Sequence, residues 1–279
     1  MKKILIALTI CTFGFTALAR TYVEEEENRT VAENEYLPVW GDVAIGLDGT
    51  PFFDYLGNMF NGTLNNSLNL GQSTLHFRYF IAGNSALRAR IRIAADYNAE
   101  TFYVTDDAAF MTDPLSRKEV IDRRINSDHL YFFSAGYQWF KSFNRLRGFL
   151  GGDAGYTWIS GKEIFEYGNV MNELNPSPTT NWGNLANRPV ETLHSQNQVI
   201  SAGIFTGAEY FFMPKVCIGG EFGLNYGLTL RGQRWERNET MAGSQLVEEE
   251  IALTPRRSRM TAETSFPSAY GNLYFMVHF

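Results

Sequence analysis

The chain is 279 residues long, with 24 Lys and Arg against 30 Asp and Glu and a formal net charge of −6. From this balance we expect no basic face that could meet the phosphates of a nucleic acid, which argues against nucleic acid as a partner. Of the two cysteines, Cys11 falls in an apolar leader and Cys217 in the body of the chain, which excludes an internal disulfide and a cysteine-based metal site in the mature protein.

The first 19 residues have the three-part layout of a secretory signal peptide. Lys2 and Lys3 precede an apolar run over residues 4–17, and residues 17–19 supply the small residues of a cleavage site. The run is about 15 residues long, short of the roughly 20 that a spanning helix needs. We therefore expect residues 1–19 to be removed, which takes away two lysines and no acids and leaves a net charge of −8.

Residues 20–39 are polar and acidic. Four consecutive glutamates, residues 24–27, are followed by Glu33 and Glu35 before the segment ends near Pro38. Runs of like charge that lack apolar partners stay solvated. We expect an acidic, flexible periplasmic tail here and a single folded domain over residues 40–279.

Beyond this tail, apolar and polar residues alternate with the period of two that is typical of strands. The clearest segment is 87–97, where Leu, Ile and Tyr take odd positions and three arginines take even ones. A helical period would scatter those arginines around the surface. The alternation predicts eight strands, at residues 40–47, 72–81, 87–97, 129–139, 146–160, 198–212, 216–231 and 266–279.

Long polar segments and tight turns separate these strands in alternation. The predicted turns are residues 82–85, 141–145 and 213–215, and the predicted loops are residues 48–71, 98–128, 161–197 and 232–265. Aromatic residues near the strand ends share the aliphatic face, whereas a soluble barrel of lipocalin type would point its apolar face inward. We therefore predict an all-β fold: an eight-stranded antiparallel transmembrane up-and-down β-barrel with short periplasmic turns, long extracellular loops and both termini in the periplasm.

The other face of the strands would line the interior, and it carries about five charges of each sign. A barrel of eight strands is only wide enough for side chains to fill. Charges in so narrow a space must be paired, because an unpaired buried charge costs several kcal/mol. We expect an ion-pair network that plugs the barrel and excludes an open pore, made of Asp42, Arg78, Arg88, Arg90, Arg92, Asp96, Arg147, Asp153, Glu209 and Glu221.

The last strand ends in Phe279 after a run of alternating residues, LYFMVHF. With the leader and the segments VAIGLDGTPFFDYLGNMFNGT and LRARIRIAADY, it resembles small outer-membrane barrels of OmpA/OmpX type, in particular those of Bacteroidota-like Gram-negative bacteria. The resemblance implies a place in the cell outer membrane among its lipids and lipopolysaccharide. It also implies that the assembly machinery reads the closing strand through Phe279. OmpA itself carries a peptidoglycan-binding domain after its barrel, but this chain stops at the closing strand, so that anchoring role is not implied.

No constellation of catalytic residues stands out. Ser127 and His129 would share one face at the outer rim, where a serine activated by histidine could attack a lipid ester, but that face offers no acid to orient the histidine. Asp106 and Asp107 are a weak cation signal without the spacing of a calcium loop. We expect no enzyme activity, no cofactor and no metal.

The expected function is therefore a monomeric, non-catalytic envelope protein that contacts other molecules through its extracellular loops. The candidate contact residues in those loops are Trp182, Trp235, Arg256, Arg257 and Arg259. Three alternatives stay open: an accessory subunit of an envelope secretion or assembly complex with a protein partner, an outer-membrane lipid-modifying enzyme, and a small pore.

Overall fold

A computed structural model of the chain describes residues 35–49, 74–263 and 272–279. Several expected segments lie outside this part: the leader, residues 20–34 of the tail, residues 50–71 of the first loop, residues 72–73 of the second strand, residues 264–265 of the last loop and residues 266–271 of the closing strand. Twelve strands and one short helix, α4 (Asp107–Thr112), make up the described chain. The strands are β1 (Val43–Asp48), β2 (Leu75–Ala82), β3 (Ser85–Thr105), β4 (Glu119–Phe143), β5 (Leu146–Glu166), β6 (Asn187–Leu193), β7 (Asn197–Met213), β8 (Val216–Arg231), β9 (Arg234–Ala242), β10 (Gln245–Thr254), β11 (Arg257–Glu263) and β12 (Asn272–His278).

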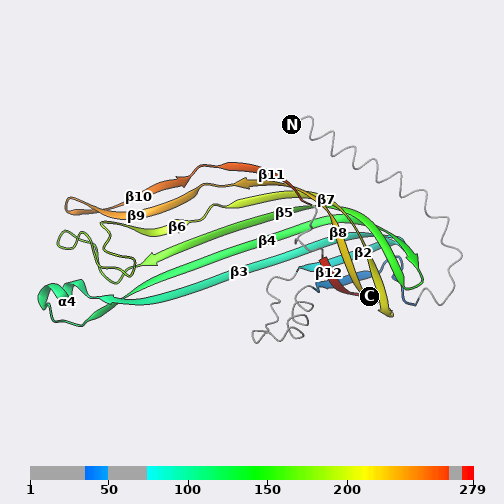
Figure 1. Ribbon diagram of the computed structural model, residues 1–279, viewed down its shortest axis with the longest axis horizontal. Helices are drawn as coiled ribbons and strands as arrows, with labels where there is room; N and C mark the ends of the chain where they lie inside the picture. The colour runs from blue at the N-terminus through cyan, green and yellow to red at the C-terminus, as the bar shows by residue number, and fades with distance from the viewer. Residues whose placement is uncertain (1–34, 50–73, 264–271) are drawn as a thin grey trace.

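The expected all-β, antiparallel architecture is confirmed. Eight of the strands pair in sequence, β1 with β2, β2 with β3, β3 with β4, β4 with β5, β5 with β7, β7 with β8 and β8 with β12. The strand β12 then pairs with β1, so the pairings return to their starting point. We call the part of the sheet in which these eight strands pair with one another the ring; it occupies the right-hand part of Figure 1, and β3, β4 and β5 continue beyond it to the left.

The three predicted tight turns are confirmed, and each joins two strands of the ring at the same end. They fall at residues 83–84, 144–145 and 214–215. Asn144 and Lys215 adopt positive φ angles of 52° and 62°, a left-handed backbone that is common in two-residue hairpins. Asn accepts this conformation more readily than most residues.

Three of the four predicted loops are wrong in large part, because strands continue through them. The hairpin of β3 and β4 keeps one register from Ser85 opposite Trp139 to Thr105 opposite Glu119. Residues 161–166 extend β5, while β6, β9, β10 and β11 occupy much of the other two segments. These strands lack an apolar face in the sequence because both faces of an open sheet meet water, so the period-two signal disappears while the backbone pairing persists.

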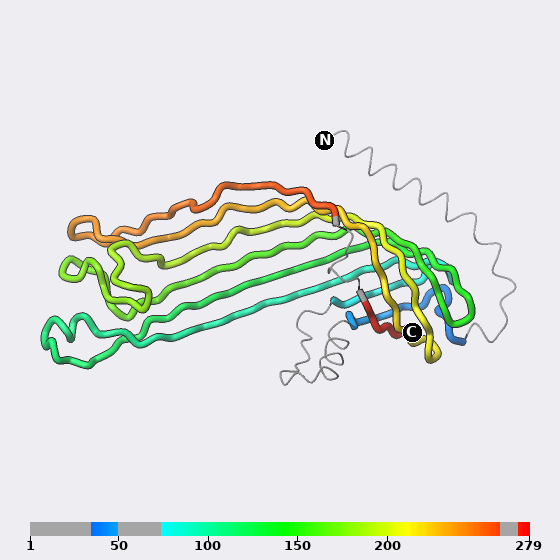
Figure 2. The backbone as a smooth tube through the Cα atoms, in the orientation of Figure 1, coloured from blue at the N-terminus to red at the C-terminus, as the bar shows by residue number. Residues whose placement is uncertain are grey.

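The result is a second region, which we call the arm: the distal parts of β3, β4 and β5 together with β6, β9 and β10. Figure 1 and Figure 2 show these strands lying side by side and leading away from the ring toward α4. The pairings are β5 with β6, β6 with β9, and β9 with β10. At 25 residues, β4 is more than twice the length of the 9–11 residues that cross a bilayer, about 85 Å at ordinary strand rise.

The N-terminal end of the described chain closes the turn end of the ring. Leu37 is buried and belongs to the same apolar cluster as Phe80, Phe140 and Phe211. The amide of Lys215 donates to the carbonyl of Tyr36 at 3.1 Å. The folded unit therefore begins before Trp40, and the last residues of the expected tail are packed rather than solvated.

The ring has an inverted distribution of polarity. Its outward positions are apolar and exposed, with Ile93, Ile204 and Phe222 each more than 60 % exposed. Its inward positions hold buried arginines, aspartate and glutamates among aromatic rings. Among the described residues, no helix is long and apolar enough to cross a membrane.

Candidate functional site

The buried charges of the ring form one cluster. Seven of the ten predicted network residues lie in it, contributed by inward positions of β2, β3, β5, β7 and β8: Arg78, Arg88, Arg90, Arg147, Asp153, Glu209 and Glu221. Four arginines thus meet three carboxylates, which is a formal excess of one positive charge rather than the equal numbers expected. We call this set the interior cluster.

The half of the cluster nearer the turns is centred on Glu209. Its Oε2 accepts from Nη1 of Arg78 at 2.6 Å and from the hydroxyl of Tyr274 at 3.0 Å. Arg78 also donates from Nη2 to the Tyr274 hydroxyl at 2.8 Å. Arg147, directly opposite Glu209 on the neighbouring strand, lies 4.0 Å from its second oxygen and donates to the carbonyl of Gly83. One carboxylate therefore serves two buried guanidinium groups.

The half nearer the arm is a crossed set of four residues. Arg88 donates two hydrogen bonds to the carboxylate of Glu221, at 2.7 and 2.8 Å. Arg90 donates to Asp153 at 2.8 Å and to the hydroxyl of Ser134 at 3.0 Å. The two pairs are linked, since Arg88 lies 3.4 Å from Asp153 and Arg90 lies 3.8 Å from Glu221. Bidentate, charge-assisted contacts of this kind are the strong ones in a protein interior.

Aromatic rings fill the space around these charges. The guanidinium carbons of Arg88 and Arg147 each lie 4.0 Å from a ring centroid, of Phe205 and Phe140 respectively. Inward glycines make room for such rings: a Cβ on Gly151 would lie 2.4 Å from Phe205, and one on Gly219 would lie 2.4 Å from Tyr274. The interior of the ring is thus packed with guanidinium planes and rings, which stack favourably.

The other three predicted network residues lie elsewhere. Asp42 pairs with Lys215 at the turn end and accepts from the amide of Val39 at 2.9 Å. Arg92 is half-buried one step beyond the cluster on β3 and makes no ion pair within the described chain. Asp96 is exposed on the arm. Phe279, the expected assembly signal, is exposed and exchanges backbone hydrogen bonds with Val43 at 2.8 and 3.1 Å.

The candidate serine and histidine of a lipid-modifying enzyme are not brought into contact. Ser127 and His129 share the outer face of β4, where His129 stacks on Tyr131 with ring centroids 6.3 Å apart. In the part of the chain that the structure describes, no hydrogen bond joins the two residues and no acid pairs with His129. Among the same residues, no group of three or more His, Cys, Asp or Glu is arranged to hold a metal ion.

The acids Asp106 and Asp107 instead build the tip of the arm. Asp106 caps α4, accepting from the amide of Ala109 at 3.1 Å. Asp107 accepts from the side chain of Asn175 and the amide of Thr179, both at 2.7 Å. Burial alone would raise the pKa of Asp107, but these hydrogen bonds and the nearby Arg188 hold its pKa below the ordinary value.

This lowered pKa predicts that the tip loosens in acid. A carboxyl whose folded-state pKa is depressed contributes its stabilisation above its ordinary pKa, and the contribution is lost as pH falls through the lower, folded value. We expect the amide of Thr179 to lose hydrogen-exchange protection several-fold between pH 6 and pH 3, after correction for intrinsic rates. Asp107→Asn should show weaker protection with no such pH dependence; an equal loss in both proteins would contradict the role of Asp107.

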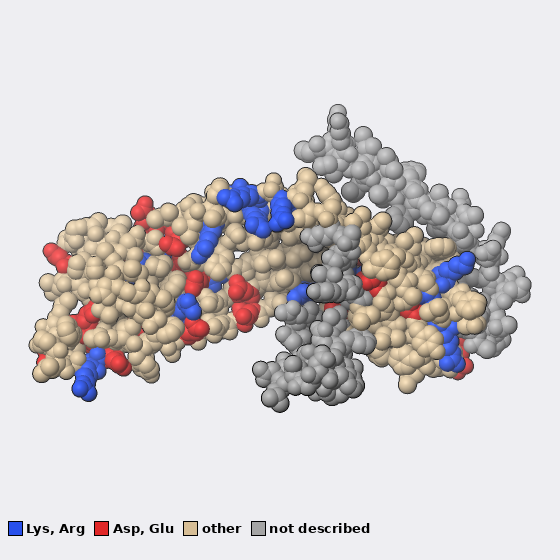
Figure 3. Space-filling model, viewed as in Figure 1, with Lys and Arg blue, Asp and Glu red and all other residues tan. Residues whose placement is uncertain are grey.

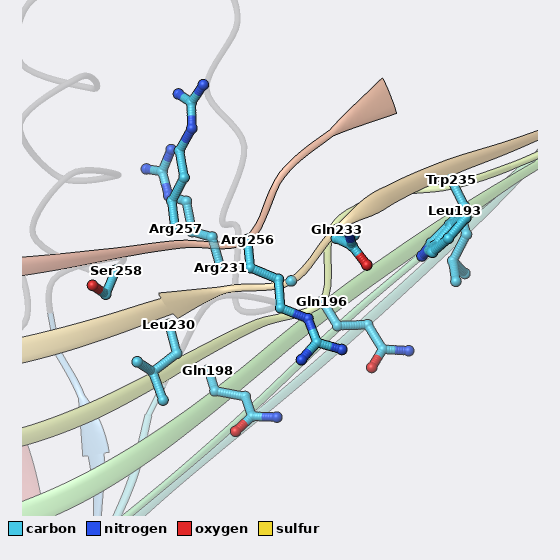
Figure 4. Close-up of a pocket in the computed structure, with 11 residues that line it drawn as sticks. Leu193, Gln196, Gln198, Leu230, Arg231, Gln233, Trp235, Arg256, Arg257 and Ser258 are labelled. Atoms are coloured by element: carbon cyan, nitrogen blue, oxygen red, sulfur yellow. The ribbon is translucent and has the colours of Figure 1, made fainter. Parts of the chain in front are cut away.

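A pocket lies at the junction of the ring and the arm, and sequence reasoning missed it as a site although it noted two of its arginines. Its volume is about 730 Å³. Its lining comes from the ends of β6 to β9 and the start of β11: Leu193, Gln196, Gln198, Leu230, Arg231, Gly232, Gln233, Trp235, Arg256, Arg257 and Ser258. Figure 4 shows Arg256 extending toward Gln196 and Gln198, while Arg231 and Arg257 extend to the other side of the strands. We call this the junction pocket.

No protein-family model matches the chain, and no curated protein matches it. What the chain does must therefore be argued from its own residues and geometry.

Proposed function

We propose that this protein is a non-catalytic outer-membrane barrel of eight strands, closed by its interior cluster, that presents the arm to contacts outside the cell. The observation that carries this proposal is the inverted polarity of the ring. Large apolar side chains face outward while arginines and carboxylates are almost wholly buried inside. In water this arrangement would expose a wide apolar surface, whereas lipid around the ring would cover that surface with apolar tails.

The packed interior favours a closed barrel rather than an open pore. The guanidinium groups, carboxylates and rings described above occupy the lumen, and Leu37 is buried in the same apolar cluster as the rings. We expect bilayers containing the purified protein to show no steady conductance. Stable channel openings would contradict a closed lumen and favour the small-pore alternative.

The arm supports a role in contact with other molecules. Its tip is held by partly buried hydrogen bonds, since Asp122 accepts from the amides of Gly168 and Asn181 at 2.9 Å each. On this fixed base the tip exposes large apolar side chains: Phe110, Met111, Leu115, Val170 and Leu174. Exposed apolar groups on an ordered scaffold are typical of a binding surface.

A pulldown from the native outer membrane tests this proposal. The tagged protein would be extracted in mild detergent and its companions identified by mass spectrometry. We expect a stoichiometric protein partner that is lost when Phe110, Leu115 and Leu174 are all replaced by serine, because those side chains are the exposed apolar contacts. Serine at Leu246 and Val247, exposed residues on β10, is the matched control and should retain the partner. Recovery of the protein from the soluble fraction would contradict the membrane location.

A further inference from the structure

The junction pocket carries positive charge that no described residue neutralises. Arg231 and Arg257 lie directly opposite each other on β8 and β11, an arrangement of like charges that destabilises a sheet. Arg256 directly precedes Arg257 in the chain, and Figure 3 shows basic side chains gathered on this part of the surface. Among the described residues, none of these three arginines pairs with a carboxylate. An anion from outside the chain would offset their repulsion.

The strands of the sheet are also interrupted beside the junction pocket. Three neighbouring long strands break at one level, between β6 and β7 (residues 194–196), between β8 and β9 (residues 232–233) and between β10 and β11 (residues 255–256). The amide of Gly232 donates to the carbonyl of Gln196 at 2.8 Å, and a Cβ on Gly232 would lie 2.8 Å from that oxygen. The breaks interrupt the side-chain rows of the sheet and leave the cavity of about 730 Å³.

The pocket sits at the border of the apolar surface of the ring. On the ring side, the outward positions of β7, β8 and β11 are apolar and exposed: Ile200, Ile204, Leu224, Tyr226, Leu230 and Met260. At the pocket, the outward positions become Gln196, Gln198 and Arg256. If lipid surrounds the ring, this border is the level of the outer-leaflet head groups.

The lining suits a lipid that carries phosphate. Arginine forks match phosphate oxygens, and the amides of Gln196 and Gln198 can donate beside them. Leu193, Leu230 and Trp235 supply an apolar wall next to these donors. A free phosphate would use only the polar part of this lining, whereas a phosphorylated lipid would use both.

We infer that the junction pocket binds the phosphorylated head group of an outer-leaflet glycolipid, with Arg256, Gln196 and Gln198 contacting the phosphate and Arg231 and Arg257 adding positive potential. This inference rests on the proposed location in the outer membrane. The bound lipid would tie the arm to the membrane surface at the point where the arm leaves it.

The test compares lipid binding by four proteins purified in neutral detergent: wild type, Arg256→Gln, the double variant Arg231→Gln/Arg257→Gln, and the control Arg117→Gln, an exposed arginine beyond α4. The probes are diphosphorylated lipid A, the same lipid after enzymatic removal of its phosphates, and inorganic phosphate. We expect wild type and the control to prefer the phosphorylated lipid about tenfold or more in native mass spectrometry, since a hydrogen bond to a charged group is worth about that much. Arg256→Gln should lose most of that preference, and the double variant should lose a smaller part of it, because Arg231 and Arg257 act only through their positive potential.

Two results would overturn the inference. Equal binding of the phosphorylated and dephosphorylated lipids by wild type would mean that the arginines do not recognise the phosphate groups. Displacement of lipid A by millimolar inorganic phosphate would mean that the site serves a free anion rather than a lipid. Membrane fractionation of the same four proteins separates this failure from that of the proposed function, because a protein found in the outer membrane without lipid preference contradicts only the inference.

Discussion

Replacement of Glu209 by glutamine is expected to lower the free energy of unfolding by about 3–5 kcal/mol, the cost of breaking a buried ion pair by removing one partner. Glu209 is 1 % exposed and is the carboxylate shared by Arg78 and Arg147. Glutamine keeps the shape and one hydrogen bond to Tyr274 but removes the charge, so two guanidinium groups would stay buried without their anion. Urea titration of tryptophan fluorescence in phospholipid vesicles measures the effect.

Glu248→Gln is the matched control. Glu248 lies 3.4 Å from Arg237 on the arm, with about half of its side chain exposed. An exposed pair of this kind gains little because water screens it and both side chains lose freedom. We expect no measurable change in the midpoint of the urea titration. If Glu209→Gln were as stable as Glu248→Gln, the interior cluster would not hold the ring together.

The strands of the ring could be predicted because each has one apolar and one polar face. The prediction for residues 216–231 coincides with β8, and that for 198–212 falls one residue short of β7 at each end. The arm could not be predicted in this way. Beyond Tyr97, β3 continues for eight residues whose two faces are both partly polar, so nothing in the apolar pattern marks them as strand.

One signal in the sequence does reach into the arm. The hairpin register that sets Arg90 opposite Ser134 also sets Glu100 opposite Arg124, and these two form a cross-strand ion pair at 2.5 Å. Complementary charges at matched distances from a turn are what a paired strand would show. The register, rather than hydrophobicity, was the usable evidence of an extended hairpin.

The residues of the interior cluster could be chosen by their face, but not their partners. Arg78 and Glu209 are 131 positions apart in sequence and meet only because the ring closes and brings β2 across from β7. Asp96 was included because it has the same parity as Arg88 and Arg90. It lies past Ile91, the last residue of β3 that pairs with a described residue of β2, and it is exposed to solvent. Parity alone does not reveal where the ring ends.

The junction pocket could not be predicted from the periodicity of the sequence, for a related reason. Its arginines come from two strands, and only the pairing of Arg231 with Arg257 shows that they repel each other. The three strand breaks that shape it each look like an ordinary irregularity in the sequence. Their common level appears only once the strands are aligned.

A charge introduced on the outer face of the ring shows whether lipid or water surrounds the ring, because the cost in stability differs between the two. Ile204, at the centre of β7, is 63 % exposed and lies opposite Leu224. In lipid, Ile204→Arg should cost about 2–4 kcal/mol, the penalty for arginine near the middle of a bilayer-spanning strand. In water, the same substitution at an exposed position would change the stability little.

Ile121→Arg supplies the comparison within one molecule. Ile121 is 52 % exposed on the outer face of the arm, opposite Tyr103 and far along β4 from the ring. Because the proposed membrane level ends near Leu230, arginine at Ile121 should meet water and leave the urea midpoint in vesicles unchanged. Equal small effects at both positions would contradict the proposal that lipid surrounds the ring. The buried arginines would then need another explanation. A large effect at Ile204 alone would locate the membrane on the ring, with the arm outside it.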